Sequence, residues 1–314
     1  MSRGEKSLRV VYDMAEAART RPALHARMLA WAAEPVDLPA FRARWTGPTQ
    51  LPVLIAYEGS EPVGWVMLDD DTEHEGPETI MAVVVTAPDD DATHAYLVRS
   101  AAEEVRALGR SGLGWLGTPD DVNARVASRL GAAARESGHF WVAEPATWGT
   151  AHPVAPAAPV RLTLPPSGAL LHAYVDLYRR SQGRGWDDAR VAAELSGPDA
   201  PGLAAGLWDG RTLRAVVHAV EVGPRVSMWF VRAGISDTET TALAVHLLDE
   251  LRAGHPQVKR VTTLSGDGWD SSPDALTAAG FRVEGRLLSF RLPVFEPLPE
   301  GDRGAEGARP MKPG

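Results

Sequence analysis

The stretch "ALTAAGFRVEGRLLSF", residues 275–290, decides the fold. It reads as the end of a helix over residues 272–280, closed by Gly280, followed by a strand over residues 281–294. Glycine is typical of a helix end, and the Phe, Val and Leu residues after it favour a strand. The elements ahead of this stretch indicate which kind of sheet the strand joins.

Those elements predict a sheet that is antiparallel at first and gains a parallel pair later. Three strands form a meander over residues 202–210, 213–222 and 225–234. A helix over 236–254 then leads to a strand over 258–265, and a strand–helix–strand crossover is typical of parallel neighbours. Two helices, 169–181 and 189–196, precede the meander and are joined by the loop "QGRGWDD" (182–188). The second half is therefore predicted to be an α+β layered unit.

The first half of the sequence repeats the same order of elements. Helices are expected over 23–35, 38–45, 90–108 and 121–137, and strands over 51–59, 63–70, 79–85, 112–117 and 139–144. Two copies of one arrangement indicate an internal duplication.

This order resembles the GNAT acyltransferase superfamily, and within it the actinobacterial tandem-GNAT proteins, the group that includes mycothiol synthase. The stretch "AAGFRVEGR" (278–286) is similar to the turn after the last helix of that family. The stretches "HLLDELRAGHPQVKRVTT" (246–263) and "RSAAEEVRALGRSGLGWLG" (99–117) are similar to its preceding helix–strand pair. The resemblance spans nearly the whole chain.

The resemblance implies two tandem GNAT-like domains, each a mixed, mostly antiparallel sheet flanked by helices. The N-terminal domain is expected over residues 1–145 and the C-terminal domain over 168–295. A Pro/Ala-rich linker, 146–167, joins them, and residues 296–314 are expected to be a disordered tail.

The resemblance also implies an acyl-CoA bound between two splayed strands, with its pyrophosphate at the N-terminus of the next helix. In the second copy this expectation falls on Val231, Arg232, Ala233, Thr238 and Thr240. The corresponding loops, "DDDATH" (89–94) and "ISDTET" (235–240), lack the family's spaced glycines and its leading Arg or Gln. Where the family often has asparagine, the second copy has Ser265 and Trp269.

Helix capping explains these two loops without a ligand. Aspartate is a preferred N-cap, so Asp89, Asp90 or Asp91 is expected to cap its helix, and Ser236 with Glu239 forms a capping-box pattern. Side chains that hold the helix amides compete with a pyrophosphate, and carboxylates repel it. The sequence leaves three possibilities for the cofactor. The protein binds acetyl-CoA, binds another acyl thioester, or binds no cofactor.

The candidate catalytic residues are Glu78, His218 and Glu221. Glu78, with Glu75 nearby, begins the strand before the first cofactor helix, and its alternative role is that of a solvated loop carboxylate. His218 and Glu221 are three residues apart on one strand, so they face opposite sides of the sheet, and His218 is either a core residue or faces the cleft. His94 is either an acid or base beside the cleft or an exposed residue.

The candidate substrate-binding residues belong to the covering loop and its neighbours. They are Arg184, Trp186, Asp187, Tyr178 and Trp229. The loop is alternatively an exposed helix connection. Tyr174 and Tyr178 share one helix face and are expected to pack there, with one hydroxyl reaching the cleft. Trp229 and Arg232 fall on opposite faces of their strand.

Composition limits the function classes. The 314 residues carry a formal net charge of −9, with no Lys/Arg cluster typical of nucleic-acid binding. With no cysteine, the chain has no thiol catalysis or thiolate metal site, and no metal is expected. No signal peptide or long apolar run is apparent, so a cytoplasmic protein without membrane partners is predicted.

Two functions remain open from the sequence. The first is an acyltransferase that moves an acyl group from a thioester to an amine of a small molecule, in specialised metabolism or self-resistance. The second is a repurposed or non-catalytic GNAT-like protein that does not use acetyl-CoA and binds a small molecule or a protein. The expected state is a monomer or homodimer.

Overall fold

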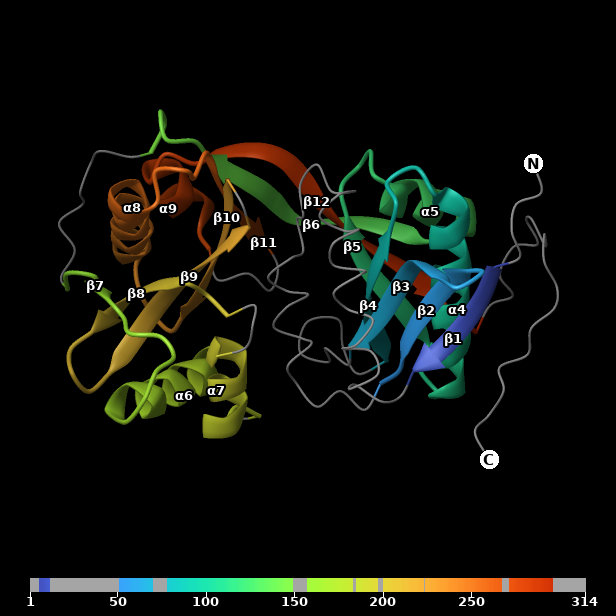
Figure 1. Cartoon of the computed structure of the whole chain (residues 1–314), viewed down its shortest axis with the longest axis horizontal. Coiled ribbons are helices and arrows are strands. Elements are labelled where there is room, and N and C mark those ends of the chain that lie inside the picture. The colour runs from blue at the N-terminus through green and yellow to red at the C-terminus, as the bar shows by residue number, and fades with distance from the viewer. Residues whose placement is uncertain are drawn as a thin grey trace. The chain divides into compact units, whose positions relative to one another are not determined.

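The computed structural model describes residues 6–11, 51–69, 78–148, 157–182, 185–196, 200–222, 224–266 and 271–295 (Figure 1). The predicted helices over 23–35 and 38–45, and the predicted tail over 296–314, lie outside the described residues. The described part is an α+β fold of mixed sheets and helices, as the sequence predicts. It divides into two compact units.

The first unit is a mixed sheet covered by two helices. Its sheet order is β1-β2-β3-β4-β5-β12, in which only β4 and β5 pair in parallel. The elements are β1 (Lys6–Val11), β2 (Val53–Glu58), β3 (Glu61–Asp69), β4 (Thr79–Thr86), α4 (Asp91–Ala107), β5 (Gly112–Gly117), α5 (Val122–Leu130) and β12 (Arg282–Pro293). The helices bury Leu97, Val98 and Val126 against the strands, and Trp115 packs on Phe290 with 5.7 Å between ring centroids.

The second unit has helices on both faces of its sheet. Its sheet order is β6-β11-β10-β9-β8-β7, with β10 and β11 in parallel. The remaining elements are β6 (Ala133–Ala143), β7 (Val160–Arg161), α6 (Ala169–Gln182), α7 (Asp188–Ser196), β8 (Leu203–Trp208), β9 (Leu213–Val222), β10 (Arg225–Arg232), α8 (Asp237–Gly254), β11 (Arg260–Gly266) and α9 (Pro273–Ala278). In Figure 1, α8 and α9 lie on one side of β8–β10, and α6 and α7 lie on the other.

Side chains alternate between the two faces of each strand, so each face of the second sheet carries its own hydrophobic core. On β9, Val217 packs in the cluster formed with α8, whereas its neighbour Val216 packs in the cluster formed with α6 and α7. Successive side chains of a strand point to opposite faces, so each strand contributes to both cores. The two faces can therefore carry different chemistry.

The closing strand of each unit comes from the other half of the sequence. Residues 288–293 of β12 pair antiparallel with β5, and residues 138–143 of β6 pair antiparallel with β11. The units accordingly divide between Ser137 and Gly138 and between Arg286 and Leu287. The sequence boundaries at 145, 146–167 and 168–295 remain predictions.

The sequence prediction of a helix over 121–137 is wrong at its C-terminal end. The helix α5 ends at Leu130, because Gly131 adopts a left-handed conformation with φ of 73° and Ala132 N–H donates to the Ala127 carbonyl at 2.9 Å. This arrangement is a glycine-based helix stop. The chain then turns at once into β6, which begins at Ala133.

We predict that Gly138→Ala destabilises the protein. An added Cβ would lie 1.9 Å from the Ser265 carbonyl oxygen on the adjacent strand, so the backbone pair of β6 and β11 would have to separate. Overpacking of this kind costs about 1–3 kcal/mol. Chemical denaturation measures the loss. The matched control is Gly285→Ala on β12, where an added Cβ meets nothing within 4 Å. Equal stability of the two variants would contradict the close contact.

Candidate functional site

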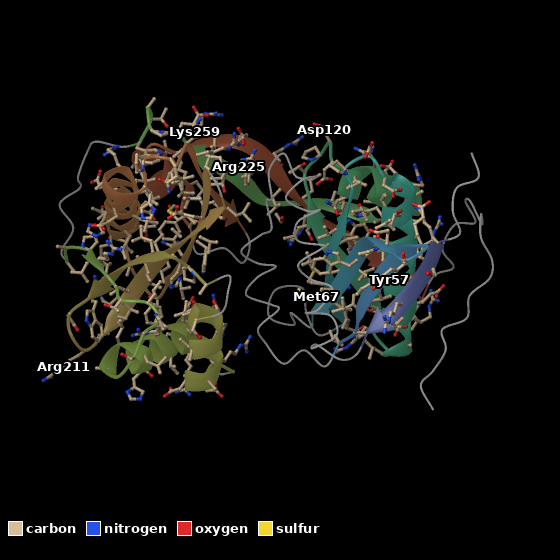
Figure 2. The ribbon with its side chains drawn as sticks, viewed as in Figure 1. Tyr57, Met67, Asp120, Arg211, Arg225 and Lys259 are labelled. Atoms are coloured by element: carbon tan, nitrogen blue, oxygen red, sulfur yellow. The ribbon has the colours of Figure 1, made fainter. Side chains whose placement is uncertain are left out.

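The parallel strand pair of each unit diverges. In the second unit the ladder between β10 and β11 ends at Ser227 and Thr262, although β10 continues to Arg232. In the first unit the ladder between β4 and β5 ends at Ala82 and Trp115, although β4 continues to Thr86. The opposite, paired end of the second unit carries Arg225 and Lys259, which Figure 2 shows close together. The diverging ends run toward the starts of α8 and α4.

The start of α8 is closed by the predicted capping box. The Ser236 hydroxyl accepts from Glu239 N–H at 3.3 Å, and the Glu239 carboxylate accepts from Ser236 N–H at 3.0 Å. The first turn of a helix leaves four amides without helical partners, and the box satisfies the first and the last of them. The amides of Asp237 and Thr238 lie between those two.

Two arginines balance the acidic residues at this helix start. Arg214 forms an ion pair with Glu239, and Arg232 donates to Thr240 Oγ1 at 3.2 Å and lies 3.8 Å from Asp237. The bond to Ser236 N–H is the largest cause that lowers the pKa of Glu239. Arginine and carboxylate groups are therefore already paired with each other at the place where a phosphate would sit.

The predicted cofactor-binding residues lie along this path. Val231 is buried toward α6, whereas the next residue, Arg232, reaches α8. Ala233 N–H donates to the Arg214 carbonyl at 3.1 Å. In the first turns of α8, Thr238 is exposed, and the buried Thr240 hydroxyl donates to the Ser236 carbonyl at 3.0 Å. Ser265, on β11, accepts from Trp141 Nε1 at 2.7 Å.

The start of α4 is capped by Asp90, as one of the three aspartates was predicted to do. Its carboxylate accepts from Thr93 N–H at 3.0 Å, and Lys6 lies 3.5 Å away. Burial raises the pKa of Asp90, but the hydrogen bonds from Thr93 and the charge of Lys6 outweigh it and lower the pKa overall. Asp91 instead pairs with Arg125 at 2.7 Å, and this hydrogen bond lowers the pKa of Asp91.

Arg125 ties the start of α5 to the loop that leads into α4. Its guanidinium group donates to the Pro88 carbonyl at 2.7 Å and to the Asp120 carbonyl at 3.1 Å, besides its bonds to Asp91. These bonds cross the diverging ends of β4 and β5 in the first unit. Arginine, with five donors in a fixed plane, suits such a multiple bridge.

His94 is buried in this region, so the expectation of an exposed histidine is wrong. Its Nδ1 lies 2.9 Å from the Thr86 hydroxyl at the end of β4. Burial is the largest cause that lowers the pKa of His94 to about 4. The side chain is therefore neutral at physiological pH.

The other face of the second sheet carries a cluster of aromatic rings. Tyr174 and Tyr178 of α6 pack together with 6.3 Å between ring centroids, and Tyr174 stacks on His218 of β9 at 5.7 Å. His218 lies 5.0 Å from Trp229 of β10, whose indole hydrogen-bonds to Tyr178. We call Tyr174, Tyr178, His218 and Trp229 the aromatic box. Strand alternation places His218 and Trp229 opposite each other in the β9–β10 register.

Glu194 of α7 completes this cluster. Its Oε1 accepts from the Tyr178 hydroxyl at 3.0 Å. Burial is the largest cause that raises the pKa of Glu194 to about 7, against the lowering effects of Tyr178 and Arg190. Burial alone lowers the pKa of His218 to about 3. Glu194 was not among the predicted site residues, although it lies four residues after Arg190 on one face of a short helix rich in alanine.

The predicted catalytic residues are not brought together. Glu78 lies exposed where β4 begins, accepts from Ser111 Oγ at 2.9 Å, and is at the paired end of β4 and β5. Glu221 lies 2.5 Å from His255 Nδ1 and faces away from His218, as the spacing predicts. Of these three residues, only His218 lies opposite the part of β10 that no longer pairs with β11. Its partner there is Trp229.

The predicted substrate-binding residues divide between the cluster and its edge. Tyr178 and Trp186 are in ring contact at 4.4 Å, and Trp229 belongs to the aromatic box. Asp187 caps α7 through Arg190 N–H at 2.8 Å. Trp229 and Arg232 face opposite sides, as predicted. Glu75, Arg184 and Trp269 lie outside the described residues.

Other site types find no support among the described residues. No group of three His, Asp or Glu side chains in these ranges has metal-binding proximity. In the same part of the chain, no helix is both long and apolar enough to cross a membrane.

The order of strands and helices, with its diverging parallel pairs, is similar to that of solved GNAT proteins. A tandem GNAT protein from the clavulanic acid biosynthesis pathway, solved without acetyl-CoA, matches with 16% identity, a TM-score of 0.61 and coverage of 92% of this chain and 99% of that chain. A GCN5-related N-acetyltransferase from Sphaerobacter thermophilus matches with 15% identity, a TM-score of 0.55 and coverage of 95% and 97%. A GNAT-family acetyltransferase from Colwellia psychrerythraea matches with 11% identity, a TM-score of 0.57 and coverage of 91% and 99%. No protein-family model and no curated protein matches the sequence.

These matches extend over the whole length of the solved proteins, and one of them is itself a tandem protein. The fold of the chain is thus that of a tandem GNAT protein.

We predict that Asp90→Ala destabilises the protein by about 1 kcal/mol, because it removes the N-cap of α4. Thermal or chemical denaturation gives the difference from the wild type. Asp89→Ala is the matched control, since Asp89 lies one residue before the cap, and we expect less than about 0.5 kcal/mol for it. A larger loss for Asp89→Ala than for Asp90→Ala would show that the cap is assigned to the wrong residue.

We predict that Glu194→Gln changes the pH dependence of stability. The pKa of Glu194 is raised to about 7 from 4.5, so the folded state binds more protons than the unfolded state between those two pH values. Its contribution therefore falls as pH rises from about 4.5 to 7 and is constant above that range. In Glu194→Gln this fall should disappear. Urea denaturation at pH 5, 6, 7 and 8 measures it, and parallel curves for the two proteins would refute the raised pKa.

Proposed function

We propose that the second unit carries an acyltransferase site, in which an acyl group moves from a thioester to an amine of a small molecule. The observation that carries this proposal is the divergence of β10 from β11 directly ahead of the start of α8. In a GNAT-like fold this is the place that suits an extended thioester arm. The backbone of β10 from Met228 to Arg232 lies beyond the β10–β11 ladder, so its amide and carbonyl groups are suited to pair with the amides of such an arm.

The second unit is favoured over the first because of Arg125. In the first unit this residue bonds the start of α5 to Asp91 and to the Pro88 carbonyl, across the place where a donor would enter. A donor that entered there would have to break the ion pair between Arg125 and Asp91. We therefore propose that the first unit has a supporting role, and that the protein is a tandem GNAT of the mycothiol synthase type with its active site in the second unit.

The donor is proposed to be acetyl-CoA or another acyl thioester. The capping box at α8 leaves the amides of Asp237 and Thr238, together with Arg232, as the groups that a phosphate could use. This is a weaker anion site than a glycine-rich loop would form, because Asp237 and Glu239 carry negative charge in the same turn. A donor whose affinity comes mainly from its thioester arm fits these groups best.

The caps of α4 and α8 also support a second candidate function. Both helix starts hold carboxylates and have two of their four orphan amides satisfied by the chain itself. A protein with two such sites is suited to bind a small molecule or a protein partner without CoA. The degenerate loops are therefore compatible with a repurposed GNAT fold.

The setting proposed for the acyltransferase is specialised metabolism or self-resistance inside the cell. One of the solved proteins with this fold belongs to the clavulanic acid biosynthesis pathway, and that likeness supports the setting. The proposed partner is a small-molecule substrate, with the chain as a monomer or homodimer and with no nucleic acid or membrane partner.

We predict that acetyl-CoA or a longer acyl-CoA raises the melting temperature of the protein. A ligand at about 100 times its Kd adds about 2.7 kcal/mol of stability. Differential scanning fluorimetry with acetyl-CoA, butyryl-CoA and a long acyl-CoA measures the shift. The absence of a shift with all three would refute the CoA-dependent function and leave the binding function.

A matched pair of variants identifies the unit that binds. Thr238 and Ala92 are both exposed and both occupy the second position of their helices, α8 and α4. A glutamate there favours the helix dipole but repels a diphosphate. Thr238→Glu should reduce the shift, and Ala92→Glu should leave it unchanged. The reverse result would assign the donor site to the first unit.

A further inference from the structure

The aromatic box contains polar atoms that have no hydrogen-bond partner among the described residues. Within the part of the chain that the structure describes, both ring nitrogens of His218 and the hydroxyl of Tyr174 are buried without a hydrogen bond. Nearly all buried polar groups in folded proteins are hydrogen-bonded, so a site with several unpartnered atoms calls for an additional group. Because the pKa of His218 is lowered to about 3, its ring is neutral and presents one acceptor nitrogen.

The rings around these atoms form a closed circuit of contacts. Tyr178 contacts Tyr174, Tyr174 stacks on His218, His218 contacts Trp229, and Trp229 bonds back to Tyr178. The faces of aromatic rings attract cations, and tryptophan does so most strongly. Trp229 is only partly buried, so it marks the side on which the box approaches solvent.

The charges beside the box favour a cation over an anion. Glu194 bonds to the box through Tyr178 at 3.0 Å. Two neighbouring arginines are bonded to the backbone: Arg179 donates to the Trp186 carbonyl at 2.7 Å, and Arg180 donates to the Leu213 carbonyl at 2.7 Å. Arg190 lies over the Trp186 ring at 4.1 Å, and its charge also acts on Glu194, where a bound cation would compete with it. A carboxylate and aromatic rings thus lie beside buried polar atoms that have no donor among the described residues.

We propose that the aromatic box, with Glu194 as its anionic partner, binds the primary ammonium group of the acceptor substrate. This assignment rests on the proposed acyl transfer to an amine and names the part of the site that holds that amine. A primary ammonium offers three N–H donors, which match the acceptors at Glu194, His218 and Tyr174. A quaternary ammonium satisfies the rings but leaves these acceptors without donors.

The test uses n-butylammonium chloride as the probe, with the full-length protein and without any thioester. Saturation-transfer NMR at pH 8.5 reports direct contact of the probe, at a pH where Glu194 is ionised. Butylammonium should bind saturably, and 1-butanol and tetramethylammonium should bind at least about tenfold more weakly, because each lacks either the charge or the N–H donors.

Two variants assign the site. Glu194→Gln should weaken butylammonium binding about tenfold or more, because the charged acceptor is lost. Glu250→Gln, which removes a carboxylate paired with Arg161 on the surface of α8, is the matched control and should bind as the wild type does. Circular dichroism checks the fold of each variant. Trp229→Leu removes a ring face at a partly buried position and should weaken binding as well.

No saturable binding, equal binding of 1-butanol, or unchanged binding in both Glu194→Gln and Trp229→Leu would overturn the assignment. Its failure is separable from failure of the acyltransferase function. Amine binding without any effect of acyl-CoA would retain the ammonium site and remove the donor site. An acyl-CoA effect without amine binding would do the opposite.

Discussion

The end of hydrogen bonding between two parallel strands is the constraint on which the proposed function depends. In the second unit, β10 and β11 share only the register from Arg225 with Arg260 to Ser227 with Thr262. The strands then separate, and the chain of β10 continues to a helix start that has partial positive charge. The first unit has the same arrangement, because the pairing of β4 with β5 also ends before β4 does. The duplicated fold therefore provides two similar places, and the side chains decide how they differ.

The side chains make the two places different in charge and access. Arg125 bridges α5 to the loop before α4 in the first unit, while in the second unit Arg214 and Arg232 pair with acidic residues of a single helix turn. Each arginine offsets the mutual repulsion of the carboxylates that gather near a helix start. These pairs hold both helix starts in one arrangement without a bound anion, which distinguishes this chain from a protein with an empty glycine-rich loop.

Much of the fold follows from local sequence patterns, because helix caps and strand alternation depend on neighbouring residues. Asp90, Ser236 and Glu239 cap as their spacing predicts, and His218 and Glu221 face opposite sides as a strand requires. The contributions of Arg125 and Glu194 were not predicted, because their partners lie 34 and 16 residues away and no local pattern encodes such contacts. The exchange of β6 and β12 between the units is likewise a non-local pairing.

That exchange has a consequence for biosynthesis. The edge of β5 acquires its neighbour only when residues 288–293 have been made, and the Val294 carbonyl then accepts from Arg106 at 2.6 Å. Until translation reaches those residues, a nascent chain presents β5 as an open edge, which is a site where strands of other chains can add. Chains that stop near the middle of the sequence would lack this closing strand. The two copies consequently depend on each other for completion.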